Sequence, residues 1–327
     1  MDRAALKAIL ENYGIKDITQ YQENDSTKDG DFRLNIFIDG KYVLRINDAV
    51  ITEERLASIS RLCERYREIG VATPRLYKNL SGRYLTPWEG RVCYLSDYLE
   101  GQTEREAQDS CNHEQVRREV LRSIGLLSRK YSGCDLSPVN SMWSIIDLAP
   151  LDVDIDEKQD NLNTLVEALH KLGESELAQK VSEFNRAKRE RIKAVYKRLP
   201  RCVIQGDLNW SNIMVENDHF AGLIDFNMAG TEVNINHFCA ETNGGIPEED
   251  FDRKTAGELY NEWRFRQDSD LEIVLREYPL NQLEADTIDD YRSIVLISQY
   301  PNVTAFLEFL ERNREKAVQL IQLILHR

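Results

Sequence analysis

The chain has 327 residues, of which 42% are apolar and 30% are charged, and its 56 acidic and 42 basic side chains give a net charge of −14. Length and apolar content allow a well-buried core, in one large domain or in two lobes. The acidic excess argues against a general nucleic-acid-binding protein, which needs basic side chains to displace counterions from phosphates. The excess is concentrated, because residues 231–290 hold 16 Asp or Glu and 5 Lys or Arg.

The sequence also argues against a membrane or secreted protein. No apolar run approaches the roughly 20 residues that a membrane-spanning helix needs. Residues 1–14 alternate charged and apolar side chains as an amphipathic helix does, without the apolar core of a secretory signal. The six cysteines are scattered with no C-x-x-C pair, so we expect them to be reduced. We therefore expect a soluble, cytoplasmic protein.

Strand patterns fill the first hundred residues. Residues 32–38 alternate apolar and polar side chains with a period of two, and Asp39-Gly40 predicts a tight turn into a second strand over 42–46. A helix is predicted over 52–69, with Thr52 as its N-cap and Gly70 as its stop. Two further short strands are predicted at 83–86 and 91–97.

The rest of the chain has mainly helical patterns. Helices are predicted near 113–131, 156–172, 175–198, 252–276, 284–299 and 303–326. Two short apolar strands interrupt them, at 202–204 and 222–224, and each ends next to an aspartate. The fold class is therefore α+β. We expect an N-terminal lobe over residues 1–98, with a small antiparallel sheet and one helix, and a larger, mainly helical C-terminal lobe over 99–327.

The most specific stretch is I-Q-G-D-L-N-W-S-N, residues 204–212. Asp207 leaves a strand through a turn that contains glycine, Asn212 follows five positions later, and a second strand presents Asp225 in I-D-F. Phosphoryl transfer from a nucleotide needs a carboxylate beside the acceptor hydroxyl and oxygen ligands for Mg²⁺. The order D-x-x-x-x-N then D-F is the order that kinases use. Each aspartate alone is more typical of a turn or a strand end, but the three residues together favour the kinase interpretation.

These motifs resemble the aminoglycoside phosphotransferase and choline kinase-like family, whose members are small-molecule kinases with a protein-kinase-like fold of two lobes. The resemblance covers about residues 18–238 and is strongest over 203–226. It implies that Asp207 is the catalytic base and that Asn212 and Asp225 hold Mg²⁺. It further implies ATP or GTP as the phosphoryl donor and a small-molecule alcohol as the acceptor.

The resemblance also assigns nucleotide-binding residues. The pattern Y-V-L-R-I, residues 42–46, places Arg45 where the family has a lysine that grips the phosphates, and the alternative is an ordinary surface arginine. Residues 94–101 are similar to the family's hinge, so the backbone of Asp97 and Leu99 would face the adenine. Ser26 or Thr27, in the turn over 24–30, would cover the phosphates in place of a glycine-rich loop.

Three departures leave an alternative open. Arg45 replaces lysine, Gln205 stands where the family usually has a histidine that supports the metal-binding strand, and the helix acid that should pair with Arg45 is unassigned, with Glu53 and Glu64 as its candidates. A nucleotide-binding pseudokinase with little transfer activity is therefore the alternative function. The presence of the full D…N…D set argues against it.

The acceptor cannot be identified from any sequence motif. The acidic segment 231–290 follows the metal-binding aspartate, and an acidic wall would attract a cationic acceptor such as an aminoglycoside or an amino alcohol. The alternative is a set of helices with solvated acidic faces. Candidates for the wall are Glu232, Glu241, Glu262 and Asp268. His237 and Cys239 are better explained by packing than by zinc binding, and the basic run 186–201 by a solvated helix face. Trp210 is expected to pack or to line the acceptor site. The oligomeric state is not predicted.

Overall fold

The structure is a computed structural model that describes residues 1–27, 32–48, 50–150, 152 and 154–326. The chain forms two compact units. Unit 1 consists of Met1–Val116 and Asp207–Ala229, and unit 2 of Arg117–Gly206 and Gly230–Arg327. Unit 1 is rich in antiparallel strands and unit 2 is mainly helical, which confirms the α+β class. The division into lobes at residues 98 and 99 stays a prediction.

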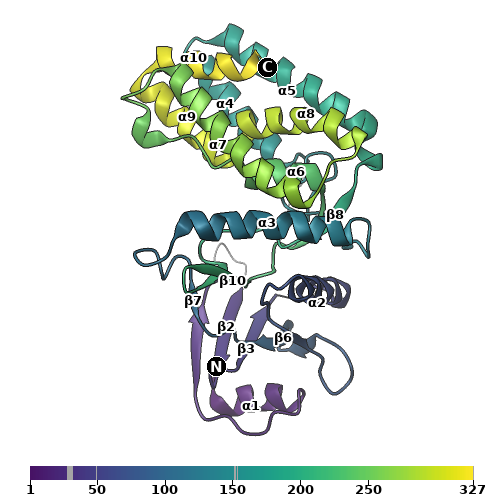
Figure 1. Ribbon diagram of the computed structural model, residues 1–327. Coiled ribbons are helices and arrows are strands. Elements are labelled where there is room, and N and C mark those ends of the chain that lie inside the picture. Colours follow the sequence, from purple (N-terminus) through teal and green to yellow (C-terminus); the bar gives the residue numbers. More distant parts are fainter. Residues whose placement is uncertain (28–31, 49, 151, 153, 327) are drawn as a thin grey trace. The chain divides into compact units, whose positions relative to one another are not determined.

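The main sheet of unit 1 is antiparallel, with strand order β1-β2-β3-β6-β4 and with β5 paired to β6 (Figure 1). Its strands are β1 (Tyr21–Asp25), β2 (Arg33–Ile38), β3 (Tyr42–Asn47), β4 (Leu76–Tyr77), β5 (Thr86–Trp88) and β6 (Arg91–Asp97). The predicted hairpin is confirmed, because Ile38 pairs with Tyr42 across the turn. Asp39 and Gly40 have the positive φ angles that such a tight turn requires.

The predicted strand over 83–86 is wrong except for its last residue. The side chain of Asn79 accepts the N–H of Arg83, and the Glu53 carboxylate accepts the N–H groups of Tyr84 and Leu85. Because side chains bind these backbone donors, the segment does not join the sheet until Thr86.

Alternation along the strands gives the sheet two distinct faces. On one face, Ile36, Ile38, Leu44 and Ile46 are buried against helix α1 (Arg3–Glu11). The other face carries Arg45, Tyr94 and Ser96 and meets helix α2 (Glu53–Glu68). Thr52 caps α2 by accepting the N–H of Arg55, as predicted. One face is therefore a hydrophobic core, and the other carries the charged side chain of Arg45 among polar and apolar neighbours.

Two strands of a smaller sheet in unit 1 lie between Asn212 and Asp225 in the sequence. Its order is β10-β9-β7, with β7 (Gln102–Thr103), β9 (Ile213–Glu216) and β10 (His219–Leu223). Ala72, just after α2, forms two backbone hydrogen bonds with the last three residues of β10. The Ala72 N–H donates to the Ala221 carbonyl, and the Ala72 carbonyl accepts from the Leu223 N–H. A side chain at Gly222 would lie 2.6 Å from the Ala72 oxygen, so only glycine fits there. This contact fixes the end of β10, two residues before Asp225.

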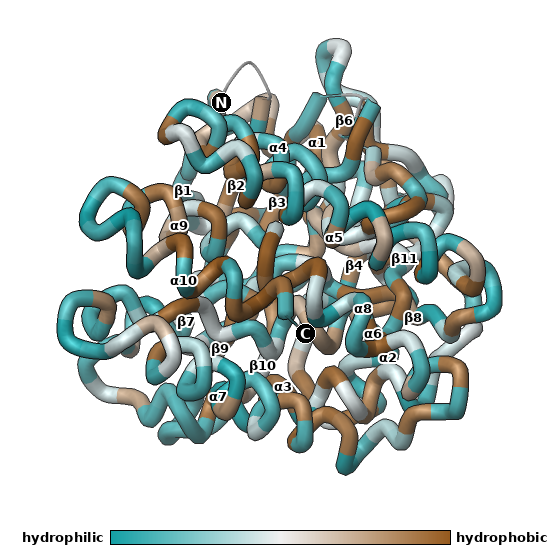
Figure 2. Tube along the Cα trace, turned by 90° about the horizontal axis from the view of Figure 1, so that it is seen from above, coloured by the Kyte–Doolittle hydropathy of each residue, from teal (hydrophilic) through white to brown (hydrophobic). Residues whose placement is uncertain are grey.

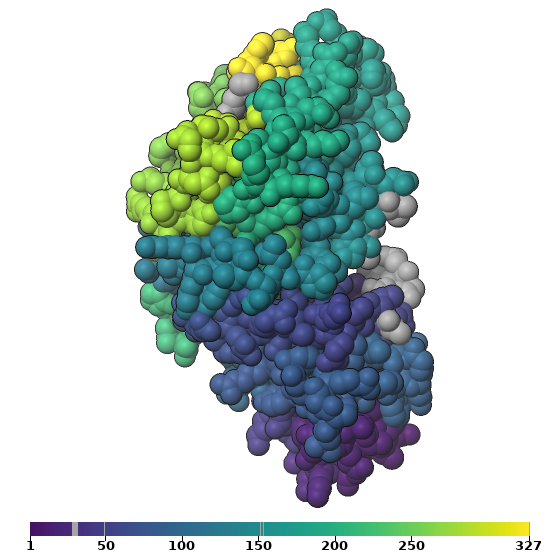
Figure 3. All heavy atoms as spheres, turned by 90° about the vertical axis from the view of Figure 1, so that its right-hand side faces the viewer, coloured from purple at the N-terminus to yellow at the C-terminus, as the bar shows by residue number. Residues whose placement is uncertain are grey.

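Unit 2 is a helical assembly around one core. Its helices are α4 (Glu157–Lys171), α5 (Ser175–Val195), α6 (Asn234–Glu241), α7 (Ala256–Glu277), α8 (Gln282–Ser298), α9 (Tyr300–Arg312) and α10 (Arg314–Leu325), with the 3₁₀ turns Tyr196–Arg198 and Glu248–Asp250. Helix α3 (His113–Tyr131) begins in unit 1 and continues into unit 2. Helices α5 and α8 lie side by side although they are far apart in the sequence (Figure 3). Strands β8 (Arg201–Ile204) and β11 (Gly230–Val233) pair antiparallel.

The structure differs from the predicted helices in two places. The single helix predicted over 303–326 is two helices, because the extended backbone of Asn313 ends α9 and its side chain caps α10 by accepting the N–H of Lys316. Helix α6 was not predicted. All but the last of its residues are buried, so it lacks the amphipathic period that marks a surface helix. Most of the other elements differ from α6, because short apolar stretches alternate with hydrophilic ones along them (Figure 2).

In the part of the chain that the structure describes, no helix combines the length and the apolar composition needed to cross a membrane.

Candidate active site

The turn before Asp207 is anchored in unit 2. Gln205 follows β8 and is fully buried. Gly206 has a φ of 83°, a conformation that favours glycine, and its carbonyl accepts the indole N–H of Trp143 at 2.7 Å. The backbone of Trp143 is held in turn, because its carbonyl accepts from Lys158 Nζ at 2.9 Å and from the Asn236 amide at 2.8 Å. The peptide that leads into Asp207 is thus fixed from one side by a rigid polar network.

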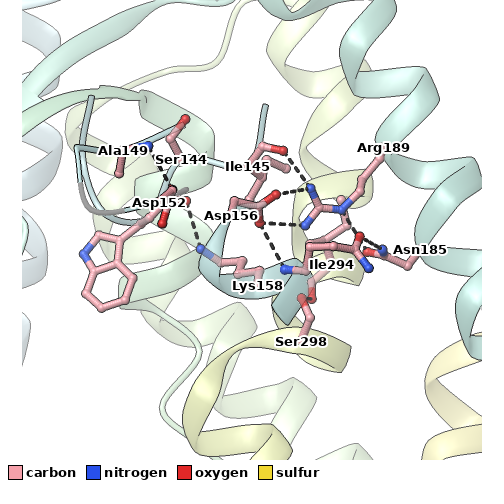
Figure 4. A network of polar contacts seen from close by, with 12 residues as sticks. Ser144, Ile145, Ala149, Asp152, Asp156, Lys158, Asn185, Arg189, Ile294 and Ser298 are labelled. Carbon is pink, nitrogen blue, oxygen red and sulfur yellow. Dashed lines mark hydrogen bonds and ion pairs between the residues drawn. The ribbon is translucent and has the colours of Figure 1, made fainter. Parts of the chain in front are cut away.

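The network continues into the helices of unit 2, as Figure 4 shows. Arg189 on α5 makes a bidentate ion pair with Asp156, at 2.7 and 2.9 Å, and donates to the Ile145 carbonyl at 2.7 Å. Asp156 also caps α4 by accepting the N–H of Gln159. Both partners of the ion pair are largely buried, so loss of either one leaves an unpaired charge in the interior.

Asp207 is oriented by two amide side chains of the same loop. Its two carboxylate oxygens accept from Asn209 Nδ2 at 2.7 Å and from Asn212 Nδ2 at 2.8 Å. Asn209 is itself held, because its Oδ1 accepts from the N–H and the hydroxyl of Ser211. The contact of Asn209 with Asp207 was not predicted from the sequence, although an Asn followed two residues later by a Ser is typical of a turn in which the Asn side chain binds the backbone.

Asn212 links the loop that carries Asp207 to Asp225. Its carbonyl accepts the N–H of Ile224 at 3.0 Å, and its Nδ2 also donates to the Asp207 carbonyl at 2.9 Å. Asp225 has a φ of 54°, a left-handed conformation that a non-glycine residue adopts only where surrounding contacts enforce it. The structure therefore brings Asp207, Asn212 and Asp225 together in unit 1.

Arg45 joins this group from the main sheet. Its Nη1 lies 3.1 Å from Asp225 Oδ1 and 3.4 Å from Asn227 Oδ1. Burial alone would lower the pKa of Arg45, but Tyr94 and Asp225 more than offset that effect and raise it. The guanidinium therefore stays charged beside Asp225 at every accessible pH.

Arg45 pairs with Asp225 and not with Glu53 or Glu64, the two acids predicted on helix α2. The carboxylate of Glu53 binds the backbone of Tyr84 and Leu85, and Glu64 is exposed. The segment after Asp225 is instead held through Asn227, whose Oδ1 accepts from the Tyr94 hydroxyl and whose carbonyl accepts from Arg55 on α2 at 2.5 Å. These contacts join residues more than 130 positions apart, so no local motif could have revealed them.

A small hollow lies beside this group in unit 1. Arg45, Asp225 and Asn227 form its polar side, and Phe226 and Tyr94 contribute aromatic rings. The remaining lining residues are Ile59, Cys63, Pro74, Leu76 and Ser96. Burial raises the pKa of the Cys63 thiol to about 12, so this cysteine stays a neutral thiol. The charged atoms of the site thus border a mainly apolar cavity.

The other three residues predicted to bind the nucleotide lie at, or just after, the ends of strands in the same unit. Ser26 follows β1 and bonds the Arg33 carbonyl through its N–H, at 2.9 Å. Residues 28–30 of the predicted phosphate-covering turn lie outside the described residues. Asp97 ends β6, where its carboxylate accepts from the Tyr77 hydroxyl at 2.5 Å, and Leu99 follows outside the regular pairing.

Many acids of the segment 231–290 have partners within unit 2. Glu232 is buried and accepts from the Ser141 hydroxyl and the Val233 N–H. Nine of the other fifteen acids pair with lysine or arginine, in the ion pairs Asp250–Lys254, Asp252–Arg312, Glu262–Lys254, Asp268–Arg292, Asp270–Arg117, Glu272–Arg276, Glu277–Arg122, Asp289–Arg292 and Asp290–Arg191. Several of these pairs are exposed to solvent, so the acids serve in part as ion-pair partners and in part as solvated surface charge.

Comparison with known proteins identifies the family of this chain. The sequence pattern of the phosphotransferase enzyme family matches residues 29–232, and the chain therefore belongs to that family. A homoserine kinase of Methylobacterium nodulans is 24% identical over 259 residues, which span 74% of this chain and 71% of the relative.

A solved structure agrees on the fold. A spectinomycin phosphotransferase in complex with ADP and spectinomycin is 14% identical, with a TM-score of 0.51 over 98% of this chain and 94% of its own.

The predicted family resemblance and the protein-kinase-like fold are thus confirmed. The chain is a small-molecule kinase, a phosphotransferase with an alcohol group as the acceptor. Its nucleotide, its metal ion and its particular acceptor are matters for proposal.

Proposed function

We propose that this protein transfers the γ-phosphoryl group of ATP or GTP to a hydroxyl of a small molecule in a Mg²⁺-dependent reaction in the cytoplasm. The observation that carries the proposal is the continuous chain of contacts from Asp207 through Asn212 to Asp225 and Arg45. A carboxylate for the acceptor, oxygen ligands for a metal and a fixed positive charge are the groups that phosphoryl transfer requires.

Asp207 acts as the catalytic base in this proposal. Its carboxylate is held by two amide donors, from Asn209 and Asn212, that cannot themselves take up the acceptor proton. It therefore has a fixed direction and remains able to accept a proton when the hydroxyl attacks the phosphorus atom. Gln205 and Gly206 support this position from the turn that follows β8, through burial and through the bond from Trp143.

Asn212 and Asp225 would hold the Mg²⁺, and their chemistry fits the ion. The Nδ2 of Asn212 points to Asp207, so its Oδ1 is the atom that can ligate a metal. A carboxylate and an amide oxygen are hard ligands of the kind that Mg²⁺ takes beside substrate phosphates and water. When bound, the ion supplies positive charge that stabilises the phosphates during transfer.

Arg45 would bind the nucleotide phosphates, in place of the family's lysine. Its planar guanidinium has five donors, so it can keep its bond to Asp225 and still donate to a phosphate. Ser26 at the β1–β2 turn would cover the phosphates, and the backbone of Asp97 and Leu99 would receive the adenine or guanine edge. Residues 1–98 then form the nucleotide-binding lobe and 99–327 the lobe that binds the acceptor.

For the acceptor we propose a small hydroxylated amine or hydroxy amino acid. The match to a homoserine kinase, named for a hydroxy amino acid, motivates this choice over a large aminoglycoside.

A screen for ADP or GDP release tests the proposal. The purified protein is incubated with ATP or GTP, with and without Mg²⁺, and with a panel of hydroxy amino acids, amino alcohols, sugars and aminoglycosides. We expect Mg²⁺-dependent release with at least one small amine or hydroxy amino acid, and a phosphomonoester signal in the ³¹P NMR spectrum of the product. Nucleotide binding without transfer to any alcohol would contradict the proposal.

A further inference from the structure

Three potential metal ligands of different kinds meet in unit 1, away from Arg45 and Asp225. Glu104 follows β7, Cys111 lies in the turn before α3, and His113 is the first residue of α3. The His113 Nδ1 lies 2.7 Å from Glu104 Oε1 and 3.5 Å from Cys111 Sγ, and one ligand atom from each residue lies within 4.8 Å of the others. We propose that these three side chains form a zinc-binding site that is distinct from the Mg²⁺ site.

The histidine ring is already turned for metal binding. Its Nε2 lies 2.9 Å from the Gln108 carbonyl, which can only accept, so Nε2 carries a hydrogen. The ring therefore directs Nδ1 at Glu104 and Cys111. Metal-bound histidines in proteins almost always donate their second ring N–H to a carbonyl or carboxylate, which fixes the ring orientation. Gln108 fills that second role here.

The spacing and the ligand types select zinc. With bonds of roughly 2.3 Å to sulfur and 2.0–2.1 Å to nitrogen, tetrahedral geometry places the two ligand atoms about 3.5 Å apart, as Cys111 Sγ and His113 Nδ1 are. The distance of 2.7 Å between Glu104 Oε1 and His113 Nδ1 would lengthen by about 0.6 Å in the same geometry. A thiolate ligand disfavours Mg²⁺ and Ca²⁺, and three protein ligands leave a fourth position for water.

The ion can enter from solvent, because the His113 side chain is 35% exposed whereas that of Glu104 is 5% exposed. Binding displaces two protons, one from the Cys111 thiol and one from the His113 Nδ1 that donates to Glu104, and solvent takes up both. The metal thereby replaces a hydrogen-bonded contact between Glu104 and His113 with three bonds to one centre.

The site is connected to the catalytic loop. The His113 ring stacks on the indole of Trp210, with 5.0 Å between centroids and 16° between planes. The Arg105 N–H donates to the Trp210 carbonyl at 3.0 Å, and the Glu104 N–H donates to Ile213 O at 2.8 Å. Zinc bound here ties the start of α3 to both sides of the loop that carries Asp207, and it restrains that loop.

Cobalt absorption tests the site directly. Co²⁺ is added to the metal-free, reduced full-length protein, and the near-ultraviolet thiolate-to-cobalt band and the visible tetrahedral bands are recorded. We expect one Co²⁺ per chain with a thiolate band that Zn²⁺ abolishes. The Cys111→Ser variant should lose the band, whereas Cys134→Ser should keep it, because Cys134 is an exposed cysteine of unit 2. A missing band in the wild type, or an unchanged band in Cys111→Ser, would overturn the proposal.

Thiol labelling gives an independent readout. Four of the six cysteines are buried, so the native protein should expose Cys111 and Cys134 to a thiol reagent. We expect Zn²⁺ to protect one of these two thiols in the wild type and none in Cys111→Ser. Protection that is equal in both proteins, or absent from the wild type, would contradict a zinc site at Cys111. A melting temperature measured with EDTA verifies that the variant is folded.

Discussion

Replacement of Arg45 by methionine is the sharpest test of the contact between the main sheet and the catalytic segment. Methionine keeps much of the length of the side chain but removes the charge and the donors that face Asp225 and Asn227. Arg45→Lys is the matched control, because it keeps the charge and removes the planar fork.

The magnitude follows from the two contacts. A hydrogen bond to a charged group contributes roughly 1.5–3 kcal/mol, and water replaces part of that because the Asp225 side chain is 39% exposed. The second contact, at 3.4 Å to Asn227, is too long to add much. We therefore expect the free energy of unfolding to fall by about 1–2 kcal/mol, which lowers Tm by a few degrees.

The effect on catalysis should be larger than the effect on stability. Loss of a positive group that faces developing charge typically lowers kcat by about 10²–10³-fold. Steady-state kinetics with varied nucleotide, together with thermal unfolding, separate the two effects. We expect Arg45→Lys to lie between wild type and Arg45→Met in both measurements. Wild-type kinetics in Arg45→Met, within a factor of three, would refute the phosphate-binding role of Arg45.

Three further predictions address the supports of the site. Arg189→Met should lower the free energy of unfolding by about 3 kcal/mol, because it leaves Asp156 buried without its bidentate partner. Equilibrium denaturation in urea measures this loss, and a change below about 1 kcal/mol would contradict the importance of the ion pair. Trp143→Phe removes the indole donor to Gly206, so we expect kcat to fall about 10-fold with little change in the nucleotide KM; a change in KM alone would contradict this role. Burial raises the pKa of the Cys63 thiol to about 12, so this thiol should resist alkylation from pH 7 to pH 10 in the native protein. Mass spectrometry that finds Cys63 labelled in this pH range would show that the hollow beside Arg45 opens.

Much of the fold could be predicted because its signals are local. The hairpin turn at Asp39-Gly40 and the cap at Thr52 each depend on neighbouring residues, and the structure places both as predicted. The break at Asn313 was missed because the apolar period continues across it, since α9 and α10 bury the same kind of face in one core.

The candidate site divides in the same way. The order of Asp207, Asn212 and Asp225 is a sequence motif, and the structure brings these residues together. The partner of Arg45 is a tertiary property, because the strand, the helix and the segment after Asp225 must all be placed before Asp225 and Asn227 can be seen to receive it. A search for an acid along the helix alone could not find that arrangement.

Phosphoryl transfer to an alcohol depends, in this proposal, on a fixed carboxylate at Asp207. The direct measurement is kcat of Asp207→Asn beside wild type, with the best acceptor of the screen and with nucleotide affinity measured in parallel. The amide keeps the size of the side chain but cannot take up the acceptor proton, so we expect kcat to fall by about 10²–10⁴-fold while the nucleotide Kd changes less than threefold. Turnover within tenfold of wild type in the folded variant would contradict the claim.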